Sequence, residues 1–541
     1  MAYPRLICLA ALFLMVLIPP ASAQFTQQSG KLVAFSNSPA EQGWSVAISG
    51  DGSTAIVGGP EAGCDPATFQ CGGEVWIYTR TSGVWTQQGP GLVGNDATTN
   101  AGIGWSVAIS ADGNTAVAGG PFDNGTDPCF GGAAWIFTRS NGIWSQQGAK
   151  LVPVSPPCSE NGVSIGTSVA ISADGNTVLV GGPGLGAFYS TLTVQDGGVW
   201  VFTRTNGAWT QQAKLQDPRG VVAGFAITQG DTVALSGDGN TALVGDPFEN
   251  RTVGATWAFT RSGGVWTSQG SKLFGVESGG PQIGVYQGSS LALSMDGNTA
   301  VIGGTPGAWV FTRSNGAWSQ QGSQLAGTGA DSAAIPGAPL TLSADGNTAI
   351  TTATANRISV SDLVFTRSSN GVWSELGEIG TSAQAGSVAL SGDGGTAILG
   401  DLEDNDGVGA VWIFTRQAAV GAPSPGTASP ASGSGSSQSM SFTFNDPRGW
   451  QDLDVVNVLI NNALDGRNAC YLAYSRASGV LYLVADNGGT LSSGLALGGS
   501  GSVSNSQCTV ASAASSAAGS GSTLTLTLNI SYTAGFGGNK L

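Results

Sequence analysis

Acidic side chains are the residues of this chain whose type and number could support catalysis or metal binding. Among its 541 residues, 34 are Asp or Glu, 19 are Lys or Arg, and none is His. The lack of His excludes Ser-His-Asp and Cys-His catalysis and every His-ligated metal site. Two carboxyl groups roughly 5–10 Å apart, one with a raised pKa, would be enough for glycoside hydrolysis.

The acidic residues concentrate in segments between repeated strands. The candidates are Glu61, Asp65, Asp123, Asp127, Asp246, Glu249, Asp401, Glu403, Asp404 and Asp406. Asp401, Asp404 and Asp406 are the calcium candidates, although their spacing departs from Asp-x-Asp-x-Asp-Gly and calcium takes about six to eight oxygen ligands. The other interpretation is solvated acid that keeps the protein soluble. We assign no catalytic residue and predict no cofactor.

The elements that must position these side chains belong to a sequence repeat. The segment Ser-x-Asp-Gly-x-Thr recurs with its aspartate at Asp51, Asp112, Asp174, Asp238, Asp296, Asp345 and Asp393. Short apolar runs on both sides of an Asp-Gly turn predict a β-hairpin. We interpret these aspartates as turn formers that hydrogen-bond their own backbone.

A second hairpin follows each of the first ones. It begins with Trp-x-Phe/Tyr-Thr-Arg and continues, after a turn, into a Gln-rich strand; in the sixth copy Leu363 replaces Trp. The arginines are Arg80, Arg139, Arg204, Arg261, Arg313, Arg367 and Arg416. Four short strands in a repeat of this length are typical of a β-propeller blade.

The two ends of the repeat array complement each other. The seventh repeat ends at Arg416 without a Gln-rich strand, whereas residues 25–32 near the N-terminus have the sequence of such a strand. Their pairing would close a ring and protect sheet edges from aggregation. We therefore predict an all-β chain, a seven-bladed β-propeller closed by an N-terminal strand and followed by a smaller β-sandwich-like domain.

The repeats resemble FG-GAP repeats, the units of the integrin α-chain β-propeller. The resemblance covers about residues 25–416 and is carried by Gly43-Trp-Ser-Val-Ala-Ile, by Ala55-Ile-Val-Gly-Gly-Pro60 and by Gly73-Glu-Val-Trp-Ile-Tyr78. Many FG-GAP repeats hold calcium between their first two strands. Here that loop contains a single carboxylate, too few for calcium.

The chain divides into four parts. Residues 1–23 have Arg5, a thirteen-residue apolar run and Ala21-Ser22-Ala23, the pattern of a secretory signal. The propeller is predicted over 24–416, a Pro/Gly/Ser-rich linker over 417–440 and the second domain over 441–541. We expect a secreted or cell-surface protein with no transmembrane segment in the mature chain.

The C-terminal domain shows strand patterns over 441–444, 470–474, 480–484 and 523–530, and helical spacing over 452–464. Residues 444–508 resemble a C-terminal module that recurs in exported bacterial proteins. We predict strands for the first four segments and a short helix for the last.

Six cysteines remain after removal of the signal, an even number that indicates disulfides in an exported chain. They are Cys64, Cys71, Cys129, Cys158, Cys470 and Cys508. The predicted strand order places the first two in one loop and the next two on one face, so we expect these pairs to bond. Cys470 and Cys508 would join strands of the second domain.

The net charge of −15 excludes nucleic acid and anionic lipid as partners. Loop lengths vary on only one predicted face of the propeller, and variable loops commonly carry function. We predict a monomeric, non-enzymatic exported protein that binds a protein or glycan ligand there, as in adhesion. The alternatives are a glycan-active propeller enzyme with paired carboxylates and a lectin-like sugar binder.

Overall fold

The computed structural model divides into two compact units, residues 24–417 and the C-terminal residues from 418 onward. We call them the repeat unit and the C-terminal unit. The structure describes residues 25–28, 30–34, 40–65, 67–68, 70–123, 131–154, 163–184, 197–216, 228–276, 284–305, 307–326, 339–355, 359–379, 386–416, 424–430, 435–447, 449–461 and 466–536. The predicted signal at 1–23 lies outside this range.

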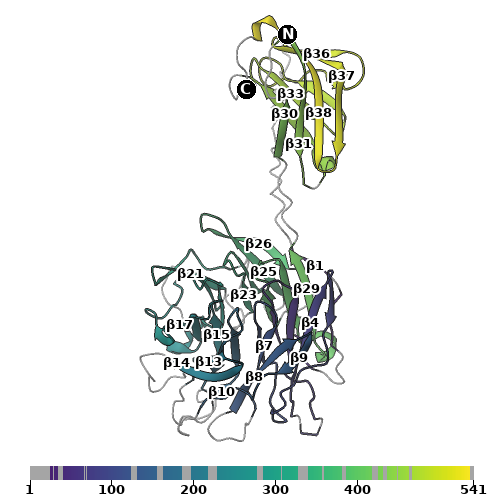
Figure 1. Cartoon of the computed structure of the whole chain (residues 1–541). Helices are drawn as coiled ribbons and strands as arrows, with labels where there is room; N and C mark the ends of the chain where they lie inside the picture. The colour runs from purple at the N-terminus through teal and green to yellow at the C-terminus, as the bar shows by residue number, and fades with distance from the viewer. Residues whose placement is uncertain are drawn as a thin grey trace, which may run out of the picture. The chain divides into compact units, whose positions relative to one another are not determined.

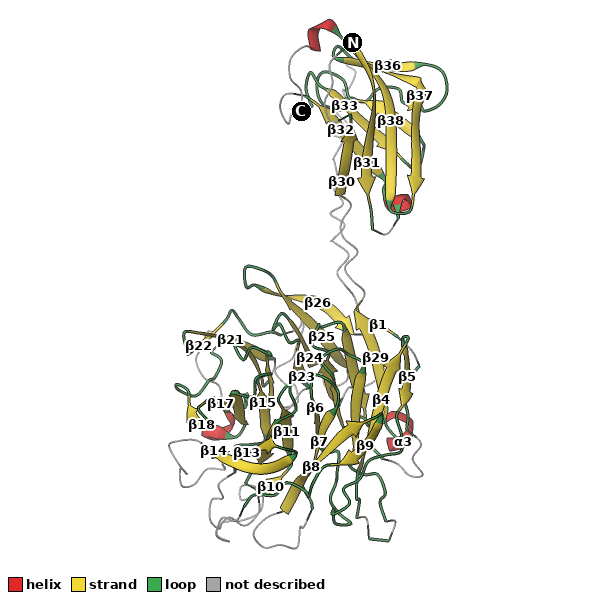
Figure 2. Cartoon of the chain, viewed as in Figure 1, coloured by secondary structure: helices red, strands yellow, loops and turns green. Residues whose placement is uncertain are grey.

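Each sequence repeat forms one sheet of four antiparallel strands, and the described part of the repeat unit contains seven of these sheets, numbered here in repeat order (Figures 1 and 2). In the second sheet a short fifth strand is added in parallel. Sheet 1 contains β2 (Ser45–Ile48), β3 (Thr54–Gly59), β4 (Glu74–Thr81) and β5 (Val84–Gln87). Sheet 2 contains β6 (Ser106–Ile109), β7 (Thr115–Gly120), β8 (Gly131–Ser140), β9 (Ile143–Gln146) and the short β10 (Ser164–Ile165). Sheet 3 contains β11 (Ser168–Ile171), β12 (Thr177–Gly182), β13 (Gly198–Thr205) and β14 (Ala208–Leu215).

Sheets 4 to 7 repeat the same order. Sheet 4 contains β15 (Thr232–Leu235), β16 (Thr241–Asp246), β17 (Ala255–Ser262) and β18 (Val265–Ser268), and sheet 5 contains β19 (Ser290–Leu293), β20 (Thr299–Gly303), β21 (Ala308–Ser314) and β22 (Ala317–Gln320). Sheet 6 contains β23 (Leu340–Leu342), β24 (Thr348–Ala355), β25 (Ser359–Arg367) and β26 (Trp373–Ile379). Sheet 7 contains β27 (Ser387–Leu390), β28 (Thr396–Asp401), β29 (Ala410–Arg416) and β1 (Phe25–Gln27).

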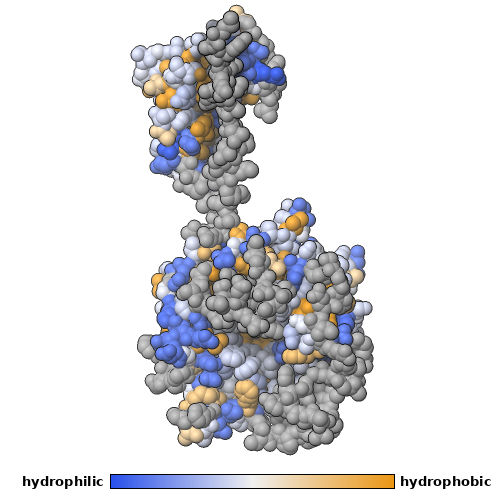
Figure 3. Space-filling model, turned by 180° about the vertical axis from the view of Figure 1, so that it is seen from behind, coloured by the Kyte–Doolittle hydropathy of each residue, from blue (hydrophilic) through white to orange (hydrophobic). Residues whose placement is uncertain are grey.

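Strand position within a sheet follows from the residue pattern. The second strands are short, largely apolar runs such as Thr54–Gly59, and those of their residues with described burial are buried. Continuous apolar runs are typical of strands covered on both faces. The fourth strands alternate, as in Val84–Gln87, where Trp85 is buried and its neighbours are exposed. In Figure 3, hydrophilic residues gather along one side of the repeat unit.

The first strand of each sheet is the inner strand, and the inner strands contact one another in sequence order, with β27 also contacting β2. The turns after them are joined by a closed cycle of backbone hydrogen bonds at 2.8–3.1 Å. In each bond the N–H of the first residue donates to the carbonyl of the second: Gly50 to Ala111, Ala111 to Ala173, Ala173 to Gly237, Gly237 to Met295, Met295 to Ala344, Ala344 to Gly392, and Gly392 to Gly50. The first and last sheets are therefore neighbours.

The N-terminal segment completes sheet 7. β1 pairs antiparallel with β29, with Phe25 opposite Arg416 and Gln27 opposite Phe414. Phe25 is only 6% exposed and packs in a cluster that includes Phe414. Gln28 Oε1 accepts a hydrogen bond from Trp85 Nε1 of sheet 1 at 3.3 Å. The segment thus joins sheet 7 to sheet 1.

The turn aspartates bond their own backbone, as predicted. Asp112 Oδ1 accepts hydrogen bonds from the Ser110 hydroxyl and the Asn114 N–H. Burial alone raises the pKa of Asp112, but these bonds outweigh it and leave the pKa below its ordinary value. The other six turn aspartates accept the same backbone N–H two residues on. We call this side of the unit the turn face.

The repeated arginines lock neighbouring sheets together on the turn face. Arg139 Nε donates to Asn114 Oδ1, and its guanidinium lies 5.4 Å from the centroid of the Trp144 ring. Arg139 and Trp144 both donate to Gln88 Oε1 of the preceding sheet. The same contacts recur around Arg204, Arg261, Arg313 and Arg367. These side chains are structural.

The C-terminal unit contains two sheets that share one hydrophobic core. The first orders its strands as β30 (Ser424–Ser429), β31 (Ser437–Asn445), β38 (Thr523–Tyr532), β37 (Cys508–Ser520) and β36 (Ser502–Ser504). The second contains β32 (Val455–Ile460), β33 (Cys470–Ser475), β34 (Val480–Leu483) and β35 (Leu495–Ala496). β30 and the start of β31 thus fall within 417–440, the range predicted as linker.

The predicted helix over 452–464 is wrong. A single 3-10 turn, η1 (Trp450–Asp452), precedes β32, which pairs antiparallel with β33. The burial of β32 alternates, with Val456 and Val458 inward and Val455 outward. β-Branched residues favour this pleated arrangement, and pairing with β33 outweighs the helical spacing of the same apolar residues.

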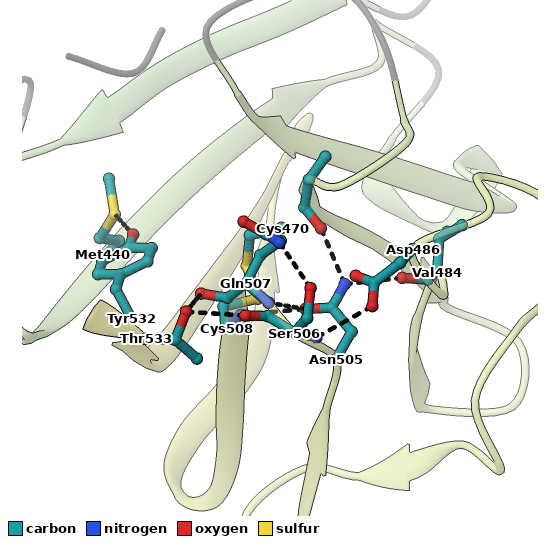
Figure 4. The surroundings of a disulfide bond; sticks show 11 residues. Met440, Cys470, Val484, Asp486, Asn505, Ser506, Gln507, Cys508, Tyr532 and Thr533 are labelled. Carbon is teal, nitrogen blue, oxygen red and sulfur yellow. Dashed lines mark hydrogen bonds between the residues drawn. A yellow bond between two sulfur atoms is a disulfide. The ribbon is translucent and has the colours of Figure 1, made fainter. Parts of the chain in front are cut away.

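The described residues contain two disulfides, Cys64–Cys71 within one loop and Cys470–Cys508 between the two C-terminal sheets. Figure 4 shows Asn505 beside the latter, where its side-chain amide donates to the carbonyls of Ala469 and Val484. Both pairs agree with the prediction and are typical of proteins outside the cytoplasm. Cys129 and Cys158 lie outside the described residues. Within the described chain, no helix has the length and apolar character needed to cross a membrane.

Candidate active site

The candidate site lies where the chain enters the inner strands, at the end opposite the turn face, which we call the loop face. In sheets 1 to 5, the residue before the inner strand lies in the same backbone turn, with its N–H donating to the carbonyl three residues earlier. The described members that share this bond are Trp44, Trp105, Thr167, Asp231 and Ser289. We call them the ring positions. Because neighbouring inner strands contact one another, these residues follow the inner cycle of sheets 1 to 5.

Two ring positions on adjacent sheets form an aromatic pair. The rings of Trp44 and Trp105 have centroids 4.5 Å apart, and Phe122 packs edge-on against Trp105 at 5.2 Å. Phe122 is 44% exposed, and both tryptophans are partly exposed. Gly102, with φ +63°, allows this packing, since a Cβ there would lie 2.8 Å from Phe122 Cδ2. Partly exposed aromatic faces of this kind can receive the apolar face of a ligand.

Sheet 4 contributes two carboxyl groups with raised pKa values. Asp231 occupies a ring position, and burial raises its pKa to about 6. Asp246 ends β16 and is 2% exposed. Burial raises its pKa to about 6 as well, although Thr228 offsets part of that effect by donating its hydroxyl and N–H to Oδ1. Carboxyls that titrate near neutral pH are suited to proton transfer.

Asp246 also fixes the turn that holds Asp231. The Thr228 hydroxyl is 2.6 Å from Asp246 Oδ1, and the Thr228 carbonyl accepts the N–H of Asp231 at 3.0 Å. In sheets 1 to 3 a glycine stands where sheet 4 has Asp246. Asp246 is therefore a buried carboxyl, specific to sheet 4 among sheets 1 to 4, that fixes the turn before the ring position Asp231.

Sheet 5 brings a hydroxyl to the next ring position. Ser289 follows Asp231 in the inner cycle, and its Oγ is buried with no hydrogen-bond partner among the described residues. A buried hydroxyl without a partner carries a desolvation cost, which is usual at functional sites. Ser289 thus places a hydroxyl on the inner strand entry of the sheet that neighbours the sheet of Asp231.

The acidic residues singled out from the sequence separate into groups. Asp123, Glu249 and Asp404 form ion pairs with Lys150, Lys272 and Lys31, respectively. Glu61, Asp65, Glu403 and Asp406 are exposed, and Asp127 lies outside the described residues. Only Asp246 and Asp401 are both buried and at the end of a second strand.

The calcium candidates are spread over different environments. Asp401 ends β28, where burial raises its pKa and its Oδ1 accepts the N–H of Glu403. Asp404 and Asp406 lie in the short α3 (Asp404–Gly407), and Asp404 Oδ2 is 2.5 Å from Lys31 Nζ, a positive charge beside the carboxylate. Within the described residues no three acidic or Cys side chains are arranged to hold a metal ion. Calcium at this loop stays a prediction.

Sequence reasoning missed Asp231, and it treated Trp44 and Trp105 only as parts of the repeat motif. A detectable signal existed, because the residue before Ser-Val-Ala-Ile or its counterpart changes from sheet to sheet while its neighbours repeat. Variation at one fixed site of a repeated scaffold indicates function rather than folding.

The buried carboxyls predict that the repeat unit gains stability between pH 7 and pH 5. A folded-state pKa near 6, above the unfolded value of 3.8, gives stability that is complete at low pH and is lost as pH rises through 6. We expect Asp246→Asn to raise the free energy of unfolding at pH 7 by about 2 kcal/mol and to flatten its pH dependence. Urea unfolding at both pH values measures this.

Asp238→Asn is the matched control, because hydrogen bonds from Ser236 and Asn240 outweigh burial and lower the pKa of Asp238. It should leave the slope between pH 5 and 7 unchanged. An Asp246→Asn variant with the wild-type slope would contradict the assignment.

No protein-family model matches the chain, and no curated protein matches it. Among solved structures, it is similar to a putative 6-phosphogluconolactonase from Bacteroides uniformis, with 14% identity and a TM-score of 0.43 over 64% of this chain and 88% of that one. It is also similar to PpgL, the periplasmic gluconolactonase of Pseudomonas aeruginosa, with 17% identity and a TM-score of 0.43 over 63% and 88%. Both are β-propeller proteins.

These comparisons correct the main functional prediction. The chain was expected to be a non-enzymatic binding or adhesion protein, but the solved structures it is similar to are named as enzymes. The alternative of a glycan-active propeller enzyme agrees with them better. Variable loops on one face serve binding and catalysis alike, so loop variation alone could not separate the two. The β-propeller prediction agrees with the all-β fold, whereas the FG-GAP resemblance has no matching family model.

Proposed function

We propose that the repeat unit is a closed, seven-bladed β-propeller enzyme that hydrolyses a sugar lactone or glycoside at the ring positions of its loop face. The observation that carries the proposal is the placement of Asp231, a partly buried carboxyl with a raised pKa, at the same backbone position as the partly exposed Trp44–Trp105 pair. Support for ring closure comes from the pairing of β1 with β29 and from the cycle of turn hydrogen bonds.

The aromatic pair would hold the sugar. Sugar rings present C–H groups on one face, and these pack against aromatic rings while hydroxyls bond to polar side chains at the edge. Trp44 and Trp105 supply that surface, and Thr167 stands between Trp105 and Asp231 in the cycle. The ring positions thus combine an apolar surface with polar groups around one centre.

Asp231 would act as the acid–base group. With a pKa of about 6 it is mostly ionised at neutral pH and still basic enough to take a proton from water. For a lactone, the water oxygen attacks the carbonyl carbon, the ester bond to the ring oxygen breaks, and the proton passes to that oxygen. Asp246 positions this carboxyl through Thr228.

The remaining assignments are proposals of the same kind. We propose that residues 1–23 direct export, that 24–416 form an FG-GAP-type propeller, and that a separate β-sandwich module follows, which includes β30 and so begins at Ser424 rather than at residue 441. The two disulfides suit a location outside the cytoplasm.

Hydrolysis by the purified mature chain tests the proposed activity. The substrates are glucono-1,5-lactone, followed with a pH indicator, and a panel of 4-nitrophenyl glycosides. We expect turnover of at least one of these well above its spontaneous rate. Sugar binding without turnover of any of them would contradict the enzyme and favour the lectin-like alternative, for which the aromatic pair is the supporting observation.

A further inference from the structure

A second aromatic contact lies on the loop face, where sheet 4 meets sheet 5. Phe248 follows β16, and Tyr286 begins the turn that holds Ser289, whose N–H donates to the Tyr286 carbonyl at 3.1 Å. The rings of Phe248 and Tyr286 pack edge to face with centroids 5.6 Å apart, and both side chains are partly exposed. We call these two residues the second aromatic pair.

Phe248 occupies the same place in sheet 4 as Phe122 does in sheet 2. Each follows a proline directly after the second strand, in Asp246-Pro-Phe248 and in Gly120-Pro-Phe122. Phe122 packs against Trp105 of the first pair. Sheets 1, 3 and 7 have no aromatic residue at this place in the sequence, so the fold of a sheet does not require one.

The backbone of Tyr286 is strained. Its φ of +53° lies in the left-handed region, where a bulky residue is a rare outlier. The N–H groups of Tyr286 and Gln287 donate to the carbonyls of Thr252 and Val253 at 2.9 and 3.1 Å, so the loop after β16 holds this turn in place. In sheet 2 the same turn begins with Gly102, which adopts the conformation without strain. Strain of this kind is concentrated at ligand-binding sites.

Asp246 connects the second aromatic pair to the proposed acid–base group. Its Oδ1 accepts the hydroxyl of Thr228, whose carbonyl holds the N–H of Asp231. The backbone N–H of Phe248 also bonds to the Asp246 carboxyl, which offsets part of the rise in pKa that burial causes. One buried carboxyl therefore anchors both Asp231 and Phe248.

Asp231 lies between the two aromatic pairs in the inner cycle. The inner strands contact one another in the order β6, β11, β15 and β19, and Asp231 directly precedes β15. β11 of sheet 3 thus separates the sheet of Trp105 from the sheet of Asp231, and the second aromatic pair follows at sheets 4 and 5. A ligand that touches both pairs must therefore extend past Thr167 and Asp231, which makes it longer than one sugar ring.

We propose that Phe248 and Tyr286 form a second sugar-binding subsite, so that the substrate is a disaccharide or a longer glycan that extends past Asp231. The inference rests on the proposed function, because it takes the Trp44–Trp105 pair as the first subsite. Aromatic rings can receive the C–H face of one sugar unit at each subsite. Two such contacts favour two linked sugar units over one.

Equilibrium binding of disaccharides and monosaccharides tests the second subsite, with calorimetry as the readout. The probes are cellobiose, maltose and lactose, compared with glucose and galactose. We expect the wild-type chain to bind at least one disaccharide about 5-fold or more tightly than either monosaccharide. Phe248→Leu should remove most of this preference by weakening disaccharide binding, because leucine is apolar but has no flat ring. Phe248→Tyr should retain the preference.

Tyr286→Asn tests the other ring of the second aromatic pair. Asparagine tolerates the left-handed backbone, so the variant loses the ring while the turn is kept. We expect the same loss of preference as in Phe248→Leu. The matched control is Val265→Ala, which removes an exposed apolar side chain at the start of β18 and should leave the preference unchanged.

Equal binding of disaccharides and monosaccharides by the wild-type chain overturns the inference, as does no binding of any probe at millimolar concentration. A preference that survives in folded Phe248→Leu or Tyr286→Asn, or that is lost in Phe248→Tyr, also overturns it. A disaccharide preference without hydrolysis of any substrate keeps the inference and overturns only the proposed catalysis. Lactone hydrolysis without a disaccharide preference does the reverse.

Discussion

Deleting residues 24–33 should remove most of the stability of the repeat unit. The deletion takes away the fourth strand of sheet 7, exposes β29, and breaks the Gln28–Trp85 hydrogen bond to sheet 1. Loss of the buried Phe25 side chain alone is expected to cost about 3–5 kcal/mol. Because a typical domain has only about 5–15 kcal/mol in total, we expect a large fall in the urea midpoint or an aggregating product.

A peptide of residues 24–34 provides the control. Added in excess to the deletion variant, it should restore the midpoint by pairing with β29, whereas the same peptide with Phe25→Asp should not. A deletion variant that unfolds at the wild-type midpoint would show that the N-terminal strand is dispensable, and ring closure would lose its support.

Asp231→Asn should lower kcat of the proposed hydrolysis by about 10²–10⁴-fold, the usual contribution of a positioned acid–base group. The amide keeps the size and the backbone turn of Asp231 but cannot take up a proton. In the wild-type chain, kcat/KM for lactone hydrolysis should fall as the pH drops through about 6, because the base becomes protonated. The variant should lose this dependence. Initial rates across pH 4.5–8 measure both effects.

Asp238→Asn is the matched control for this variant, because Asp231 and Asp238 stand just before and just after the same inner strand, β15. The control should retain wild-type kcat. Circular dichroism and sugar affinity check that Asp231→Asn still folds and still binds. A folded Asp231→Asn variant with wild-type kcat would remove Asp231 from the mechanism.

The hairpins and their turns could be predicted because the responsible interactions are local. Ser110, Asp112 and Asn114 bond one another within five residues, so the same short motif gives the same turn wherever it recurs. The N-terminal strand was predictable for a related reason, since Phe25-Thr-Gln-Gln repeats a pattern found elsewhere in the chain.

Patterns that fit two structures were less informative. Residues 452–464 carry apolar groups at helical spacing, but the segment is also rich in β-branched residues. Pairing with Cys470–Ser475 decided in favour of a strand. That pairing joins residues that are 10 to 20 positions apart, from Ile460 with Cys470 to Val455 with Ser475, so the apolar spacing within 452–464 alone does not reveal it.

The sequence by itself determined the strands, the turns and their repetition, because these depend on neighbours along the chain. Only the tertiary structure decided which acidic groups are available for chemistry. Lys31 pairs with Asp404 across 373 residues, and Asp123 is paired by Lys150. Asp231 has a raised pKa because the packed sheets withdraw it from water. Ion pairing and desolvation depend on which distant segments meet, and residue type and spacing do not specify that.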